Sequence, residues 1–228
     1  MNHPVDKHLP YYGLLESLQN AEGCALCQMR DRRSRRYLEN LLYENVNDAG
    51  LQNELIRSRG LCGHHAKILL SLGDGLGIAI LYQNQVAMGL AFLERLGRVR
   101  ERRLRRRAIL EWDKHGQCPA CALQDQDEEL RIGTLLDSLR DPAMRQALER
   151  SPGLCIPHLL KVLAADNEVS THQYLVDLHR SKLVSLLDEL KEFCRRHDYR
   201  HSHEKLGEEA DSWRRAVEML VGDRDERR

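Results

Sequence analysis

The 228-residue sequence is poor in aromatic residues, which make up 5% of it, and no proline lies between Pro10 and Pro119. With so few aromatic residues, the core must consist mainly of Leu, Ile, Val, Ala and Met. The long proline-free stretch is rich in Leu, Ala, Glu and Arg, and it lacks the Val/Ile alternation of β-strands. The sequence therefore predicts an all-α fold of about ten helices.

Two further absences bear on the location of the protein. No stretch approaches the ~18 apolar residues of a membrane-spanning helix, and residues 1–12 lack the apolar segment of a signal peptide. We therefore expect a cytoplasmic protein that makes no membrane contact. Because cytosolic thiols stay reduced, and because seven cysteines cannot all pair, the cysteines are expected to be metal ligands rather than disulfides.

The sequence has no net charge, since 35 basic residues balance 35 acidic ones. The charges are nevertheless unevenly placed. Residues 1–114 carry 18 Lys and Arg against 13 Asp and Glu, which gives +5 (18 − 13), so the remainder carries −5. This asymmetry predicts opposed electrostatic surfaces rather than a general binder of polyanions.

A four-part cysteine–histidine pattern occurs twice and uses six of the seven cysteines. Its first copy is Cys24-x2-Cys27 with Cys62-x2-His65, and its second is Cys118-x2-Cys121 with Cys155-x2-His158. Matching positions differ by 94, 94, 93 and 93 residues (118 − 24, 121 − 27, 155 − 62, 158 − 65). Three thiolates and one imidazole are the ligand set of a closed tetrahedral zinc site. The pattern predicts a duplicated helical unit with one Cys3His metal site closing each copy.

The spacing of the ligands also predicts local structure. A separation of three residues at the start of a helix places both side chains on one side. Gly60 and Gly153, which precede the second ligand pairs, are expected to supply a sharp turn, and a helical hairpin within each copy is expected to bring its two pairs together. His64 is matched by Pro157 in the second copy, whereas His65 is matched by His158, so His65 is the predicted ligand.

The predicted cofactor is Zn²⁺, two ions per chain, with a [4Fe–4S] cluster as the alternative. Because Cys118-Pro-Ala-Cys121 is not near a βαβ unit, a thioredoxin-like redox pair is disfavoured. Four protein ligands leave no open coordination position, so we expect structural sites, no enzymatic activity there, and a protein that acts by binding an unidentified protein partner. A redox- or metal-responsive switch is the first alternative.

A long helix is predicted from Leu76 to about Asp113. It contains eight arginines, which are Arg95, Arg98, Arg100, Arg102, Arg103, Arg105, Arg106 and Arg107. This run predicts either a solvated helix that pairs with the acidic second half or a nucleic-acid-binding helix. Long helices of this kind could also pair between chains in a homo-oligomer.

The C-terminal segment leaves two questions open. Cys194-x2-His197 is followed by His201, His203 and Glu204, which form either a surface cluster or an open third metal site; only the latter would support a metal-dependent enzyme. Asp198, Arg200, Glu209 and Asp211 form either a buried polar network or a ligand pocket. Trp213 and Leu220 are expected to dock the last helix on the body.

The predicted organisation is a first helical repeat with a basic helix (1–114), a second repeat (115–198) and a C-terminal extension (199–228), within one compact body. The paired CxxC and GLCxxH motifs, followed by His197-Asp198-Tyr199-Arg200 and Glu209-Ala210-Asp211-Ser212-Trp213, resemble an uncharacterised bacterial family known as a domain of unknown function. The resemblance covers nearly the whole chain. It implies a cytoplasmic bacterial protein with paired metal-ligand motifs, and no activity.

Overall fold

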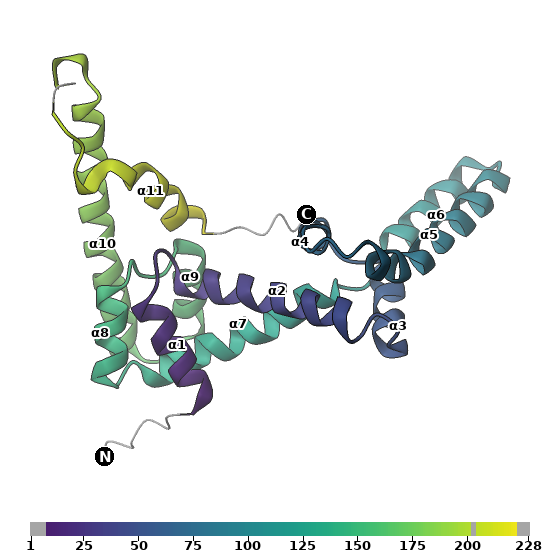
Figure 1. Ribbon diagram of the computed structural model, residues 1–228, viewed down its shortest axis with the longest axis horizontal. Helices are drawn as coiled ribbons and strands as arrows, with labels where there is room; N and C mark the ends of the chain where they lie inside the picture. Colours follow the sequence, from purple (N-terminus) through teal and green to yellow (C-terminus); the bar gives the residue numbers. More distant parts are fainter. Residues whose placement is uncertain (1–7, 202–203, 223–228) are drawn as a thin grey trace. The chain divides into compact units, whose positions relative to one another are not determined.

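The computed structural model describes residues 8–201 and 204–222, and those residues contain helices and no β-strand (Figure 1). The α-helices are α1 (Leu9–Gln19), α2 (Ala25–Tyr43), α3 (Ala49–Ser58), α4 (Gly63–Ser71), α5 (Gly75–Arg98), α6 (Arg102–Asp113), α7 (Pro119–Ser138), α8 (Pro142–Arg150), α9 (Ile156–Ala165), α10 (Val169–Arg196) and α11 (Ser212–Val221). Two short 3₁₀ helices, η1 (Tyr199–His201) and η2 (Glu208–Asp211), lie between α10 and α11. The all-α prediction is confirmed.

The chain forms two compact units, and neither is a continuous half of the sequence. The first, here called the outer unit, combines the described parts of 1–31 and 127–224; the second, the central unit, consists of residues 32–126. The outer unit thus contains the start of α2 and the end of α7, whereas the central unit contains the end of α2 and the start of α7. Each unit therefore joins segments from both halves of the sequence.

The outer unit has an aliphatic core. Its fully buried side chains include Leu14, Leu18, Leu26, Leu135, Leu139, Met144, Leu148, Leu154, Val162 and Leu175. The phenol of Tyr11, on α1, donates a hydrogen bond of 2.8 Å to the carboxylate of Asp141. The same carboxylate accepts from the backbone N–H of Ala143 and so caps the start of α8. One buried acid thus joins α1 to the first turn of α8.

The central unit has a smaller core of the same kind. Its buried apolar residues are Leu38, Leu41, Leu42, Leu55, Leu69 and Leu81, together with Cys118, Ala120 and Cys121. Aspartates begin two of its helices, because Asp48 accepts from Leu51 N at the start of α3 and Asp74 accepts from Gly77 N at the start of α5. The start of α7, with its cysteines, is part of this core.

Helices α2 and α7 pack against each other in opposite directions. In the central unit, buried Gln124 of α7 donates a hydrogen bond to the hydroxyl of buried Ser34 of α2. In the outer unit, Nη1 of Arg131 lies 3.3 Å from Sδ of Met29. The contact further along α7 (Arg131) involves the earlier residue of α2 (Met29), so the two helices run in opposite directions. The start of one helix therefore lies in the same unit as the end of the other.

The single helix expected from Leu76 to Asp113 is wrong, because the chain breaks at Val99–Glu101. Val99 and Glu101 have extended backbones, with ψ angles of 107° and 126°. Helix α6 then runs back beside α5 (Figure 1), and the rings of Phe92 and Trp112 stack with centroids 4.2 Å apart. The guanidinium of Arg59 lies 3.8 Å above Trp112, which adds a cation–π contact to the pair.

The docking expected for Trp213 and Leu220 is also wrong. Both side chains are 56% exposed, although α11 packs on α9 and α10. The helix instead turns its Ser212 side inward, where Ser212 is buried and Met219 half-buried. Acidic residues preceding an apolar run do predict a helix start here, but not which side of the helix is covered.

Replacement of Tyr11 by phenylalanine tests the link between α1 and α8. The change removes one of the hydrogen bonds that the buried carboxylate of Asp141 accepts, and a bond to a charged group contributes roughly 1.5–3 kcal/mol. We expect Tyr11→Phe to lower the free energy of unfolding by about that amount in denaturant titrations. Its neighbour Tyr12 is 54% exposed, so Tyr12→Phe serves as the control and should change the free energy by less than about 0.5 kcal/mol. Equal effects would contradict this account of Asp141.

Candidate metal centres

All four ligand pairs lie at the starts of helices, as the spacing predicts. Cys24, Cys62, Cys118 and Cys155 each immediately precede the first residue of α2, α4, α7 and α9. The second residue of every pair lies three positions further, in the first helical turn. The matching caps have nearly the same backbone, with φ and ψ of −64° and 164° at Cys62 and −64° and 157° at Cys155. Each helix start therefore presents two donor atoms in one direction.

The turns before the second ligand pairs depend on glycine. Gly60 and Gly153 have φ angles of 92° and 95°, in the region that side chains rarely adopt. A Cβ at Gly153 would lie 2.9 Å from Cδ of Lys182. The sharp entry that was expected from Gly60 and Gly153 is present at both positions.

The structure brings the eight predicted residues together in two groups of four. One group is Cys24, Cys27, Cys155 and His158 in the outer unit, and the other is Cys62, His65, Cys118 and Cys121 in the central unit. Within each group all donor atoms lie within 4.8 Å of one another. His65, and not His64, belongs to a group, as the register of the two copies predicts.

The expected pairing of the ligands is wrong. Each group takes its CxxC pair from one copy of the pattern and its CxxH pair from the other. The reason is the length of α2, which has 19 residues and therefore carries the chain about 28 Å away from Cys24. The antiparallel contact of α2 with α7 places the end of α7, followed by α8 and α9, in the unit that contains Cys24.

In the outer group, Nδ1 of His158 faces all three sulfur atoms. It lies 3.4 Å from Sγ of Cys24, 3.2 Å from that of Cys27 and 3.1 Å from that of Cys155. The sulfurs of Cys27 and Cys155 are 3.7 Å apart. All four side chains are buried. Such a set of converging donors is suited to a single small cation.

The central group repeats this arrangement. Nδ1 of His65 lies 3.2 Å from Sγ of Cys62, 3.6 Å from that of Cys118 and 3.4 Å from that of Cys121. The sulfurs of Cys62 and Cys121 are 3.6 Å apart. Hydrogen bonding by Cys121, which outweighs burial, lowers the pKa of Cys118 to about 3, whereas that of Cys121 is raised. The contact between the two thiols thus favours the thiolate form of Cys118, which is the form that binds metal ions.

The two groups differ behind the histidine. In the outer group, Nε2 of His158 lies 2.9 Å from a carboxylate oxygen of buried Glu128, which also contacts the amine of Lys161 at 2.6 Å. Burial alone would raise the pKa of Glu128, but hydrogen bonds with His158 and Lys161 lower it to about 2. In the central group, Nε2 of His65 is buried and has no hydrogen-bond partner among the described residues.

Sequence reasoning missed Glu128, although it lies two helical turns after Cys121 on α7. Its counterpart at the 94-residue offset is Ser34, so the repeat gives no signal for it. Gly222 was missed as well. It follows α11 with φ 65°, and a Cβ there would lie 2.8 Å from Sγ of Cys155. The backbone at the end of α11 thus closes over the thiols of the outer group.

The arginine run lies at the far end of the α5–α6 pair and is exposed throughout Arg100–Arg107. Of its arginines, Arg107 forms an ion pair with Glu111 at 2.9 Å, and Arg95 lies 5.8 Å from the Phe92 ring. No other ion pair of the run is present within the described residues of the central unit. The run is therefore a solvated surface of this unit.

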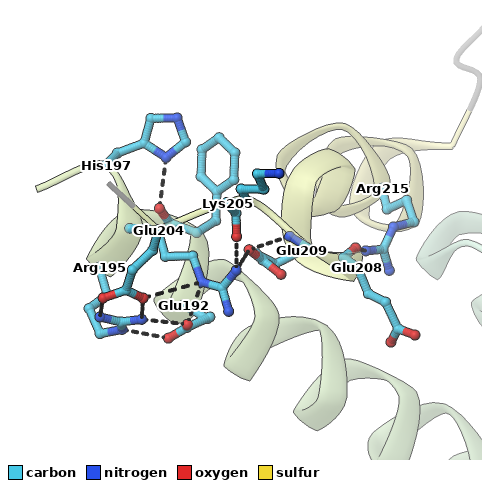
Figure 2. Close-up of polar contacts among 11 residues, drawn as sticks. Glu192, Arg195, His197, Glu204, Lys205, Glu208, Glu209 and Arg215 are labelled. Atoms are coloured by element: carbon cyan, nitrogen blue, oxygen red, sulfur yellow. Dashed lines mark hydrogen bonds and ion pairs between the residues drawn. The ribbon is translucent and has the colours of Figure 1, made fainter. Parts of the chain in front are cut away.

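The C-terminal acidic residues do not form one network. Asp198 pairs with Arg200, and Asp211 pairs with Arg215 at 2.7 Å. Glu209 is buried and contacts Arg196 at 3.0 Å, and Arg196 also binds Glu192 (Figure 2). These ion pairs hold the turn between α10 and η2. Among the described residues, Asp198, Glu209 and Asp211 each pair with an arginine and do not converge on one point.

The expected histidine cluster is only partly described. Nδ1 of His197 lies 2.8 Å from the carbonyl oxygen of Phe193, and Glu204 pairs with Arg195 (Figure 2). His203 and the side chain of His201 lie outside the described residues. Cys194 is exposed and belongs to neither group of four.

The fold and the two clusters define an all-helical protein with two buried Cys3His groups that suit metal ions. Residues 8–227 match the model of a family of unknown function, DUF6062, and the chain belongs to that family. It is 26% identical over 208 residues to an "Uncharacterized 23.9 kDa protein in xynA 3'region" of Caldicellulosiruptor sp. (strain Rt8B.4), which covers 88% of this chain and 96% of that protein. No solved structure matches the chain.

Replacement of Glu128 by glutamine tests its role behind His158. Loss of a carboxylate that orients a ligating histidine typically lowers metal affinity by roughly 10–100-fold. We expect Glu128→Gln to weaken the outer site by about that factor in competition with a chromophoric chelator, and to leave the central site unchanged. The exposed neighbour Glu129 provides the control, and Glu129→Gln should behave as the wild type. A loss of affinity at the central site instead would contradict this arrangement.

Proposed function

We propose that this protein binds two zinc ions in structural Cys3His sites, and that the ions hold together a helical scaffold that acts by binding a protein partner. The observation that carries the metal proposal is the convergence of four donors in each group, with the histidine Nδ1 facing three sulfurs. A zinc–sulfur distance of about 2.3 Å in a tetrahedron puts two sulfurs about 3.8 Å apart. The sulfur pairs at 3.7 and 3.6 Å fit that spacing.

The same geometry favours zinc over a [4Fe–4S] cluster. The cysteine ligands of such a cluster bind four different iron atoms, so their sulfurs stand apart on the corners of the cluster. Donor atoms that all lie within 4.8 Å leave space for one ion and none for a cluster. Thiolate ligation also requires reduced cysteines, which supports a cytoplasmic location for the proposed function.

A structural role follows from the proposed coordination. Three thiolates and an imidazole complete a tetrahedron, and no position remains for water or a substrate. Each ion would then connect helix starts that are distant in sequence, and its binding free energy would contribute to folding. Because both units have small cores made mainly of aliphatic side chains, the binding free energy of the ions would add substantially to their stability.

Metal analysis of single and double variants tests the proposal and the pairing together. We expect two zinc ions per chain in the wild type and about one in Cys27→Ser. Adding His158→Ala to Cys27→Ser should leave one ion, because both residues belong to the outer site. Adding His65→Ala instead should remove both ions.

The opposite result for the double variants would contradict the exchanged pairing, while a visible absorbance with bound iron and sulfide would contradict zinc. His64→Ala is the matched control for His65→Ala. It should retain two ions, since His64 lies in neither group.

A redox-responsive role is a second candidate, and one observation favours it. Two surface cavities reach the outer group, one lined by Cys24 and Cys155 and the other by Cys24 and Cys27. A peroxide that enters either cavity could oxidise the thiolates of Cys24 and Cys27 to a disulfide, with two electrons passing to the peroxide, which is reduced to water. Loss of these two ligands would release the ion.

Zinc release measured with a chromophoric chelator during peroxide titration tests this candidate. One equivalent of zinc should appear together with loss of two thiols, and reduction with added zinc should restore both. Thiol loss confined to exposed Cys194, with both ions retained, would contradict it. A Cys194→Ser background separates the two cases.

A further inference from the structure

Helix α5 carries an exposed seam with the spacing of a coiled coil. The seam consists of Leu76, Ala79, Gln83, Val86, Leu90, Leu93 and Gly97, and all seven residues are exposed. Their separations alternate between three and four residues, which is the a/d pattern of a heptad repeat. The larger side chains are 75% (Leu76), 69% (Val86), 60% (Leu90) and 63% (Leu93) exposed. Four large aliphatic side chains in one row thus face solvent.

The opposite side of α5 is already packed in the central unit. Leu81 is buried in its core, and the hydroxyl of Tyr82 accepts a hydrogen bond of 3.4 Å from the backbone N–H of Leu61. Further along, Phe92 stacks on Trp112 of α6. Helix α5 is therefore apolar on two sides and covered on one. Helices that are apolar all round are normally covered all round.

This double apolar character corrects the expectation that no stretch of the sequence resembles a membrane span. Helix α5 is long and apolar enough to cross a membrane by length and composition. Its middle, however, contains three consecutive amide side chains, Gln83, Asn84 and Gln85, whose polar groups would be costly in a bilayer. Crossing would also pull Leu81 and Tyr82 out of the core that surrounds the central metal ligands.

We propose that the seam binds the same seam of a second copy of this chain, in an antiparallel two-helix coiled coil. An a/d row of this kind needs a helix with the same row, and a second copy supplies one.

Charge selects the antiparallel direction. The C-terminal end of α5 and the start of α6 carry the eight arginines of Arg95–Arg107, mostly without acidic partners in their own unit. Parallel pairing would place two such runs side by side. Antiparallel pairing with a positions facing d positions instead sets Ala79 opposite Leu90 and Gln83 opposite Val86 of the second copy, and it puts the two arginine runs at opposite ends of the paired helices. Contact between the two like-charged runs is thus avoided.

The oligomeric state of seam variants tests the proposal. We expect the zinc-loaded wild type to dimerise in the micromolar range by sedimentation velocity, since the seam is only about three heptads long. Leu90→Glu should be monomeric at about 100 µM. Ala91→Glu adds the same charge to the same helix at an exposed position outside the seam and should dimerise like the wild type. Both variants should retain two zinc ions, which separates loss of the dimer from loss of the metal sites.

Cross-linking tests the direction of pairing in a Cys194→Ser background. A mixture of Ala79→Cys and Leu90→Cys proteins should give the mixed disulfide dimer, and each protein alone should give little. Self-dimers of each would overturn the antiparallel arrangement. A wild type that is monomeric at about 100 µM, equal behaviour of Leu90→Glu and Ala91→Glu, or a monomer that floats with anionic phosphatidylserine vesicles would overturn the proposal.

Discussion

The fold depends on one constraint: in each of the two clusters, the starts of two helices converge on the same point. In each cluster a thiol pair from the start of one long helix meets a thiol and an imidazole from the start of a short one. In the outer unit these pairs are separated by 128–134 residues, and in the central unit by 53–59. Three thiols and an imidazole packed within 4.8 Å are compatible with burial only if they hold one another's protons or share a cation. The proposed ions would satisfy these buried donor atoms and would cross-link segments that are distant in sequence. Cross-links that close long loops reduce the entropy of the unfolded chain.

The exchange of ligand pairs gives α2 and α7 a double role. Each begins with two ligands of one cluster and ends in the unit that contains the other cluster. Their antiparallel contact is stabilised by Gln124 with Ser34 in one unit and by Arg131 with Met29 in the other. The clusters are nevertheless not equivalent. Glu128 fixes the ring of His158, whereas Nε2 of His65 is unsatisfied among the described residues. No hydrogen bond from the described residues therefore orients the ring of His65 on its Nε2 side, and we expect the proposed ion of the central site to exchange faster than that of the outer site.

The sequence contained most of the ligand information, because matched spacings in two copies identify the eight residues and separate His65 from His64. It could not give the pairing, since intervals of 33 and 34 residues are compatible with a hairpin inside one copy. What decides the pairing is that α2 has 19 residues and contacts α7 in the opposite direction, which is a property of tertiary contacts.

The repeat could not reveal Glu128 either, because the matching position in the other copy is Ser34. The break between α5 and α6 was missed because no proline marks it; the stacking of Phe92 on Trp112, a contact between residues 20 positions apart, holds the returning helix.

Helix α5 shows why composition and position must be considered together. Composition alone makes it a membrane-spanning candidate, and helical periodicity alone makes it part of one long basic helix. Burial separates its residues into two sets: Leu81, Tyr82, Met88 and Phe92 turn toward their own unit, while the row from Leu76 to Gly97 turns to solvent. Because Leu81 and Tyr82 belong to the core that contains Cys118 and Cys121, α5 cannot leave its unit without disturbing the central cluster. A partner of the exposed row must therefore approach a helix that stays fixed in its unit. The regular alternation of three and four residues in the row suits a second helix better than lipid.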